Sequence, residues 1–366
     1  MTYDPALRRR TPLAMTLAHE IMRNGPMPVA EYMQRCLWDQ QSGYYTTRNP
    51  LGQSGDFVTA PEISQVFGEL IGLWSAVVWC DTFRAPEAVT LVELGPGRGT
   101  LLSDALRATK SLSAFSQARR CHLVEASRPL IELQGVTLSP SGAALSWGHD
   151  LSGVSAPAVI IANEFFDALP IDQFIMTVDG WRERTVGLDE SGMLCLTVGP
   201  VPAAGITTKL PAAAVGAIAE RVNSVAMIEA ISSIAQRGPL AALIIDYGHA
   251  TSAIGDTLQA VRGHTHEHPL TSPGEADVSA QVDFAVLQSV AISAGLEVDG
   301  PVTQSEFLSR LGIVERAANL MSANPALAGA IEFAIARLIA PEAMGSRFKV
   351  LGLRSRSLPR LPGFGS

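Results

Sequence analysis

The sequence predicts an α/β protein built on a doubly wound, mostly parallel sheet, with an N-terminal helical segment, an antiparallel β insertion and a helical insertion. Three observations predict this class. Strand-like apolar runs alternate with helix-like periodicity from Thr90 onward, a glycine-rich turn follows the first run, and paired turn signals interrupt the alternation once. Such alternation is typical of a parallel sheet covered on both faces.

The composition fits a chain that buries a large core. Of the 366 residues, 47% are apolar and 17% are charged, which excludes disorder and favours one elaborated domain or two. The formal net charge of −8 argues against a dedicated nucleic-acid binder. No apolar run approaches the roughly 20 residues that span a bilayer, so we expect no membrane insertion.

The cysteines and the N-terminus predict a reducing compartment. No Cys-x-x-Cys pair occurs among Cys36, Cys80, Cys121 and Cys195, so the sequence gives no zinc signature. The first apolar stretch is interrupted by His19 and Glu20, which is typical of an amphipathic helix and not of a secretory signal. The few residues before Pro12 leave no room for a transit peptide, so we expect a bacterial cytoplasmic protein rather than a mitochondrial one.

The first 82 residues are expected to form the helical extension, and residues 83–366 the main domain. A strong helix is predicted over 62–80, because apolar residues share one stripe of it: Ile63, Val66, Phe67, Leu70, Trp74 and Val77. Thr59 to Glu62 has the spacing of a capping box with proline in the first turn. Capping is therefore the plainer interpretation of Glu62, and a place in a substrate pocket is the alternative.

From residue 90 the order of elements follows the change of periodicity. Strands are predicted at 90–94, 121–126, 144–147 and 158–163, with helices after the first two. Turn signals at 179–180 and 190–192 indicate an antiparallel insertion over about 173–200. The predicted remainder is a helix at 222–237, a strand at 240–248, a helix at 282–294, a strand at 296–302, inserted helices at about 304–340 and a last strand at 347–355.

Three glycines, Gly95, Gly97 and Gly99, lie between the first predicted strand and its helix. Such a turn lets backbone amides approach a ligand closely. The dinucleotide pattern G-x-G-x-x-G would need glycine at position 100, where Thr100 stands, so a nicotinamide or flavin site fits imperfectly. Glu93 precedes the turn, and an acid there suits a ligand with an ammonium or sulfonium group better than a pyrophosphate.

Two further acids follow the next strands. Glu125 ends the second strand, where it can accept hydrogen bonds from ribose hydroxyls, and Asp150 follows the third, within reach of an adenine edge. A ribose, an adenine and a cationic amino-acid tail together describe S-adenosylmethionine as the cofactor. The alternative is that the glycines only form a tight turn.

The stretch "ANEFFDALP", residues 162–170, follows the fourth strand. In a doubly wound sheet Asn163, Glu164 and Asp167 would meet a substrate at the crevice and are the candidate catalytic residues, with Phe165 excluding water. The alternative is that Asn163 and Asp167 cap a short helix and that the phenylalanines are core.

Two polar stretches in the C-terminal half of the chain are further candidates for a functional site. "HTHEH", residues 264–268, would place three histidines on one strand face, but its glycine and proline neighbours predict a loop and no metal is expected. In "PGEADVSAQVDF" Asp277 follows a Pro-Gly turn and is a candidate for the substrate pocket, with helix capping by Asp277 or Ser279 as the alternative.

Five motifs together resemble the MidA-type S-adenosylmethionine-dependent methyltransferases: "GDFVTAPEISQVFGELIG", "VELGPGRGTL", "ANEFFDALP", "RGHTHEHPLTSPGEADVSAQVDF" and "MGSRFKVLGL". The resemblance runs from about Pro12 to Leu353. It implies a class I methyltransferase fold, a cofactor-binding role for Glu93 and the three glycines, and, from mitochondrial members that assist respiratory complex I assembly, a protein arginine substrate.

The sequence is thus compatible with three functions. A protein arginine methyltransferase, plausibly acting on a respiratory complex I subunit, is the leading hypothesis. A non-catalytic assembly chaperone that retains the cofactor pocket is the second, and a nicotinamide-dependent oxidoreductase is disfavoured by Glu93 and Thr100. The sequence does not predict the oligomeric state, and it gives no sign of a nucleic-acid substrate.

Overall fold

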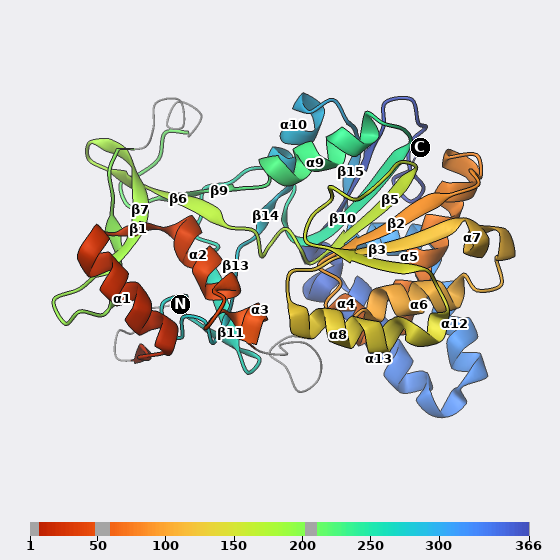
Figure 1. Cartoon of the computed structure of the whole chain (residues 1–366), viewed down its shortest axis with the longest axis horizontal. Helices are drawn as coiled ribbons and strands as arrows, with labels where there is room; N and C mark the ends of the chain where they lie inside the picture. The colour runs from red at the N-terminus through yellow and green to blue at the C-terminus, as the bar shows by residue number, and fades with distance from the viewer. Residues whose placement is uncertain (1–6, 48–58, 202–210, 366) are drawn as a thin grey trace. The chain divides into compact units, whose positions relative to one another are not determined.

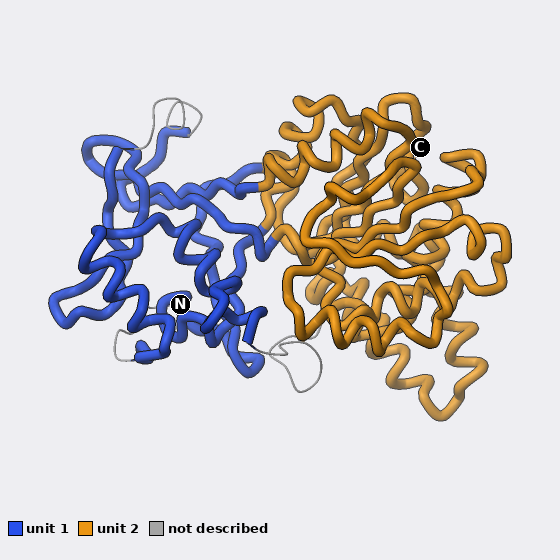
Figure 2. Tube along the Cα trace, viewed as in Figure 1, with its two compact units in different colours: residues 1–57, 167–223, 252–281 blue, residues 58–166, 224–251, 282–366 orange. Residues whose placement is uncertain are grey.

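The computed structural model describes residues 7–47, 59–201 and 211–365, and the chain divides into two compact units (Figure 2). Unit 1 comprises residues 1–57, 167–223 and 252–281, and unit 2 comprises residues 58–166, 224–251 and 282–366. The domain boundary expected at residue 82 falls inside unit 2. Residues 48–58, which include the start of the first family motif and part of a turn-rich stretch, lie outside the described residues.

Unit 2 is built on a sheet with the strand order β15-β16-β10-β5-β2-β3-β4, and β14 pairs with the end of β10 (Figure 1). In the described chain its strands are β2 (Val89–Leu94), β3 (Arg119–Val124), β4 (Leu145–Gly148), β5 (Ala158–Asn163), β10 (Leu240–His249), β14 (Val282–Asp283), β15 (Glu297–Thr303) and β16 (Phe348–Arg354). The strands from β4 to β10 are parallel, and β16 is antiparallel to both of its neighbours.

The order of these strands creates a switch point beside β2. The chain proceeds from β2 outward to β3 and β4 and then returns to β5 on the other side of β2. In open α/β sheets ligands bind at the carboxyl ends of the strands where the order reverses. The ends of β2 and β5, at Leu94 and Asn163, are therefore the place in this fold where a ligand is expected.

Helices cover both faces of this sheet, as the alternating sequence predicts. One face carries α9 and α10, and the other carries α5, α6 and α8 (Figure 1). The α-helices described in unit 2 are α4 (Ala60–Ile63), α5 (Gln65–Val77), α6 (Thr100–Ala108), α7 (Ser113–Ala118), α8 (Arg128–Leu138), α9 (Val225–Ala235), α10 (Phe284–Ser293), α11 (Gln304–Arg310), α12 (Ile313–Ala323) and α13 (Ala328–Ile339). Predicted strands and helices thus occur in the predicted order.

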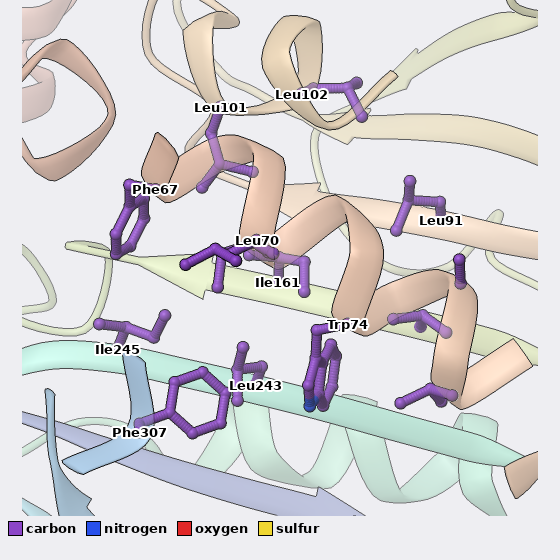
Figure 3. Packing of buried hydrophobic residues seen from close by; sticks show 14 of the residues in the cluster. Phe67, Leu70, Trp74, Leu91, Leu101, Leu102, Ile161, Leu243, Ile245 and Phe307 are labelled. Carbon is purple, nitrogen blue, oxygen red and sulfur yellow. The ribbon is translucent and has the colours of Figure 1, made fainter. Parts of the chain in front are cut away.

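The core of unit 2 lies between α5 and the sheet. Figure 3 shows Phe67, Leu70 and Trp74 of α5 lying against side chains from the sheet, among them Ile161 and Leu243. These labelled side chains are at most 4% exposed. Burial of large apolar side chains at about 1.5–3 kcal/mol each fixes α5 on this face.

The prediction of one continuous helix over 62–80 is wrong. α4 ends at Ile63, Ser64 has extended backbone angles (φ −154°, ψ 130°), and α5 starts at Gln65. The Ser64 hydroxyl accepts the backbone N–H of Val66, so Ser64 caps α5. The last turn is a π-helix over Val78–Thr82.

Unit 1 combines the N-terminal helices with antiparallel strands from later in the chain. Its described elements are α1 (Pro12–Asn24), β1 (Met27–Pro28), α2 (Val29–Trp38), α3 (Tyr44–Thr47), β6 (Ile171–Thr177), β7 (Gly180–Leu188), β8 (Leu194–Val198), β9 (Ile218–Val222), β11 (Gln259–Arg262), β12 (Thr265–Glu267) and β13 (Asp277–Ser279). Met27 of β1 pairs with Val186 of β7. Residues of α1 and α2, such as Leu17 and Tyr32, share one core with residues of these strands.

Two sequence-based expectations about unit 1 and its borders are corrected. β9 ends at Val222, where a helix was expected to begin, and α9 begins at Val225. Within the stretch expected to be a loop, Thr265–Glu267 form β12, which pairs with β11 in a hairpin closed by Gly263 and His264, with left-handed φ of 56° and 60°. No helix described in the structure is long and apolar enough to cross a membrane.

Candidate functional site: a glycine turn and carboxylates at the switch point

The glycine turn joins β2 to α6 at the switch point. Gly95, Gly97 and Gly99 have φ of 59°, 54° and 80°, all in the left-handed region. Residues with a Cβ atom are disfavoured there by roughly 1–2 kcal/mol, so the turn requires glycine. Gly99 is the N-cap of α6, and its backbone N–H donates to the carbonyl of Pro96 at 2.8 Å. The predicted tight turn between strand and helix is confirmed.

Glu93 lies one residue before the end of β2 and is 5% exposed. Burial raises the pKa of Glu93 to about 8; the backbone N–H of Leu102 in α6 lowers it, and the charge of Glu125 raises it. Alternation along β2 places Glu93 on the same face as Leu91, under α5 and α6, where it borders a cavity of about 10 Å³.

The Oε2 atom of Glu93 has no hydrogen-bond partner among the described residues. An unpartnered buried acceptor has a free-energy cost of roughly 1–3 kcal/mol, which a ligand N–H would remove. A cationic group would also favour the ionised carboxylate. The unpartnered acceptor beside the glycine turn therefore fits the ammonium end of an amino-acid-like ligand.

Glu125 follows β3 and is also buried, 4% exposed. Its Oε1 accepts the backbone N–H of Ser127 at 2.8 Å, and its Oε2 accepts Nε2 of Gln134 at 3.1 Å. Burial raises the pKa of Glu125, although these hydrogen bonds oppose the shift. A carboxylate has about four acceptor positions, so capacity remains for a ligand hydroxyl.

Gln134 of α8 connects Glu125 to the glycine turn. Besides Glu125, its Nε2 donates to the carbonyl of Gly97 at 2.8 Å, and its Oε1 accepts Nε1 of Trp147 in β4 at 2.9 Å. Gln134 is 0% exposed. No local sequence signal identified it, because one glutamine in an amphipathic helix looks like an ordinary surface residue.

Asp150, in the loop after β4, differs from these buried carboxylates because its side chain is exposed. Its Oδ1 accepts the backbone N–H of Ser152 at 2.8 Å, which forms an Asx turn. The side-chain and backbone groups of Ser152 lower the pKa of Asp150. An ionised, exposed carboxylate at this place is available to an adenine amino group.

The turn after β5 does not start a helix within residues 164–170, so the capping interpretation of Asn163 and Asp167 is wrong. Glu164 has a left-handed φ of 50°. Its Oε1 accepts Nδ2 of Asn163 at 3.1 Å, which fixes the Asn163 amide. The Oδ1 atom of Asn163 is consequently buried without a hydrogen-bond partner in the described part of the chain.

Asp246 of β10 holds this turn in place and was missed by sequence reasoning. It is 0% exposed, and its Oδ2 accepts the backbone N–H groups of Phe165 at 3.2 Å and Phe166 at 2.9 Å. Its signal is an acid at the end of an apolar strand, "LIIDYG", the same pattern that identified Glu93. Phe165 in turn lies against the glycine turn, since a Cβ atom on Gly95 would stand 3.0 Å from its ring.

The segment at Thr59 to Glu62 is joined to the same turns, and its capping-box interpretation is wrong. Thr59 makes no side-chain cap hydrogen bond. Instead, the backbone N–H of Ala60 donates to Oε1 of Glu164 at 3.0 Å, and Oε1 of Glu62 accepts the hydroxyl of Thr100 at 2.5 Å. Glu62 and Glu164 thereby connect α4 to the start of α6 and to the turn after β5.

Asp167 and Asp277 belong to unit 1. Asp277 lies in β13 and not at a helix start, since Asp283 caps α10 by accepting the N–H of Val286. The Tyr45 hydroxyl donates to Oδ1 of Asp277 at 3.1 Å. Burial raises the pKa of Tyr45 well above its ordinary value, and the charges of Asp277 and Asp167 raise it further. Tyr45, Asp167 and Asp277 thus form one cluster within unit 1.

In the three described stretches, no group of three or more histidine, cysteine, aspartate or glutamate side chains is arranged to hold a metal ion. The groups at the switch point are buried carboxylates and one amide oxygen, which accept hydrogen bonds, beside a glycine turn. These groups suit an organic ligand with ammonium and hydroxyl groups.

The strand order and the glycine turn define the class I methyltransferase fold. Residues 70–302 match the family described as "Putative S-adenosyl-L-methionine-dependent methyltransferase". A Burkholderia thailandensis protein whose crystal structure contains S-adenosyl-homocysteine is 26% identical, with a TM-score of 0.85 over 98% of this chain and 96% of that chain.

Curated relatives match at higher identity. "Protein arginine methyltransferase NDUFAF7, mitochondrial" from Danio rerio is 37% identical over 91% of this chain and 84% of its own length. The human protein of the same name is 36% identical over 96% of this chain and 85% of its own length. The chain belongs to this family of S-adenosyl-L-methionine-dependent methyltransferases, and S-adenosylmethionine is its cofactor.

Proposed function

We propose that this enzyme transfers the methyl group of S-adenosylmethionine to an arginine side chain of a partner protein. The proposal is supported by the names of its relatives and by one feature of the site, the unpartnered Oδ1 of Asn163. Because the Asn163 amide is oriented by Glu164, the atom left free is an acceptor. A guanidinium offers five N–H donors and no acceptor, so it complements this atom.

We propose cofactor roles for three carboxylates that lie at or just after the ends of β2, β3 and β4. Glu93 binds the ammonium through Oε2, Glu125 accepts the ribose hydroxyls and Asp150 accepts from the adenine. The backbone of Gly95, Gly97 and Gly99 passes close to the methionine tail, because a glycine turn between strand and helix lets backbone amides approach a ligand closely. The three acids and the turn belong to unit 2.

S-adenosylmethionine supplies an electrophilic methyl group on a sulfonium sulfur. As the methyl carbon bonds to a guanidinium nitrogen, the carbon–sulfur bond breaks with its electron pair on sulfur, and the nitrogen loses one proton. A guanidinium has a pKa above about 12, so this nitrogen needs carboxylates that localise the positive charge on the other nitrogens. We assign this work to Glu164, with Asn163 orienting the nitrogen and Glu62 and Phe165 completing the pocket within unit 2.

The experiment measures labelled methyl transfer from S-adenosylmethionine into proteins of a cell lysate, followed by mapping of the modified residue. We expect label on arginine, and Glu164→Gln and Asn163→Leu should lower transfer at least about 10-fold while S-adenosylhomocysteine still binds. Glu132→Gln is the matched control, because that glutamate is 71% exposed on α8. Label on lysine or RNA would refute the arginine acceptor.

Undiminished transfer by both variants would show that the acceptor site does not include Asn163 and Glu164. Absence of any transfer by a protein that binds the cofactor would favour the non-catalytic assembly role. The family resemblance supports a subunit of respiratory complex I as the acceptor, and the interruption of the first apolar stretch by His19 and Glu20 supports a cytoplasmic location. Purified subunits of that complex are therefore the first substrates to assay.

A further inference from the structure

Gln134 is a fully buried amide whose three hydrogen bonds join three parts of the fold. It links the glycine turn through Gly97, the end of β3 through Glu125 and β4 through Trp147. All of these residues lie in unit 2. A buried amide that makes bonds in three directions constrains each of its partners.

The orientation of this amide follows from chemistry. An indole Nε1 can only donate, so the atom facing Trp147 must be the oxygen of Gln134. The amino group then faces the Gly97 carbonyl and the Glu125 carboxylate, which can only accept. A flipped amide would place its oxygen against two acceptors and its N–H groups against a donor, and a single arrangement therefore results.

We propose that Gln134 is a positioning residue of the cofactor site, holding Glu125 in the arrangement that receives the ribose end of the cofactor. This inference rests on the ribose-binding role proposed for Glu125. Ser127 holds one carboxylate oxygen of Glu125 and Gln134 holds the other, so the plane of the carboxylate is fixed before a ligand arrives. A preorganised acceptor binds more tightly because less side-chain entropy is lost on binding.

The test is calorimetric measurement of S-adenosylhomocysteine affinity for the wild type and for Gln134→Leu. A second ligand, the analogue that lacks both ribose hydroxyls, shows whether the effect passes through Glu125. We expect Gln134→Leu to weaken S-adenosylhomocysteine binding about 10- to 100-fold, as for a lost bond to a charged group. Binding of the analogue should weaken much less, so that the variant no longer distinguishes the two ligands as the wild type does.

Gln304→Leu is the matched control. Gln304 is also 0% exposed, lies on a helix of unit 2 and donates to a backbone carbonyl, that of Leu338, at 2.8 Å. Both leucine variants should lower the melting temperature, but only Gln134→Leu should change ligand affinity. Wild-type affinity in Gln134→Leu, or equal losses for both ligands, would overturn the positioning role.

Two further variants keep the test decisive. If Gln134→Leu does not fold, Trp147→Phe removes the donor that orients the amide, and unchanged affinity and ligand discrimination in that variant would overturn the inference. Glu125→Gln separates the inference from the proposed function. Loss of affinity in Glu125→Gln with none in Gln134→Leu rejects the inference alone, whereas wild-type affinity in Glu125→Gln rejects the ribose role of Glu125 as well.

Discussion

Asp246 Oδ2 accepts the backbone N–H of Phe166 at 2.9 Å, so a carboxylate of β10 holds the turn that follows its neighbour β5. The same oxygen accepts the N–H of Phe165, and Oδ1 accepts the N–H of Tyr247. This turn carries Asn163 and Glu164, and Glu164 has a left-handed φ of 50°. The conformation of the proposed acceptor site therefore depends on an acid outside it.

Replacing Asp246 with alanine should lower the free energy of unfolding by roughly 2–4 kcal/mol, because several buried N–H groups lose their acceptor. Urea denaturation measures this loss. Asp246→Asn keeps one acceptor oxygen and should lose less. Equal stability of the alanine and asparagine variants would contradict the role of the carboxylate as a shared acceptor.

Gly97→Val should abolish binding of S-adenosylhomocysteine. The left-handed φ of 54° costs a residue with a Cβ roughly 1–2 kcal/mol, and the new side chain occupies space proposed for the methionine tail. Gly142→Val is the matched control, since Gly142 has a φ of 63° and nothing lies within 4 Å of its added Cβ. We expect the two variants to have similar melting temperatures. Calorimetric titrations should show that only Gly97→Val has lost binding of S-adenosylhomocysteine. Retained binding by Gly97→Val would contradict the proposed place of the methionine tail.

The raised pKa of Glu93 predicts a defined dependence of stability on pH. Its pKa is about 8 in the folded chain and roughly 4.5 when unfolded, so between these values the folded state holds a proton that the unfolded state has lost. The stability contributed by Glu93 is therefore fully present below about pH 4.5 and declines until about pH 8. Glu93→Gln lacks this decline. The free energy of unfolding of the variant should therefore rise relative to that of the wild type as the pH increases from about 4.5 to about 8.

Urea titrations of both proteins at several pH values between 5 and 9 check this expectation without ligand. The difference between the two proteins should grow with pH and become constant above about pH 8. A difference that stays constant over the whole range would show that Glu93 is ionised in the folded protein at neutral pH.

Ligand binding should release protons if Glu93 binds the ammonium. At pH 7 a carboxyl with a pKa of about 8 is mostly protonated, and a cation beside it favours the ionised form. Calorimetry of S-adenosylhomocysteine binding in phosphate and in Tris should give different enthalpies. The difference should equal the number of protons released multiplied by the difference between the ionisation enthalpies of the two buffers. Glu93→Gln should remove this buffer dependence, and an equal dependence in both proteins would point to another proton donor.

The sequence predicts the architecture of unit 2 because its signals are local. Apolar runs separated by helix-like periodicity identify β2, β3, β4, β5 and β10, and the same reasoning places Glu93 and Glu125 at strand ends. The assembly of unit 1 could not be predicted in this way. Its strand pairing, such as Met27 with Val186, joins residues far apart in sequence, and no local pattern encodes a distant partner.

The candidate site shows the same division. The glycine turn could be predicted from the spacing of its glycines. The hydrogen bond from the Ala60 N–H to Glu164 joins residues more than 100 positions apart, so the local pattern at Thr59 to Glu62 indicated a capping box instead. Sequence reasoning did not identify Asp246 and Gln134, because their hydrogen-bond partners belong to other elements of the fold. Such roles appear only when the fold brings those elements together.

The three-segment construction of unit 1 sets the order in which a growing chain can mature. Residues 1–57 leave the ribosome first, yet the strands that cover Leu13, Leu17 and Tyr32 come from residues 167–223 and 252–281. At about 5–20 residues per second, these apolar side chains stay uncovered for on the order of tens of seconds of synthesis. The apolar side chains of α1 and α2 therefore gain their full cover only after residue 281 has emerged.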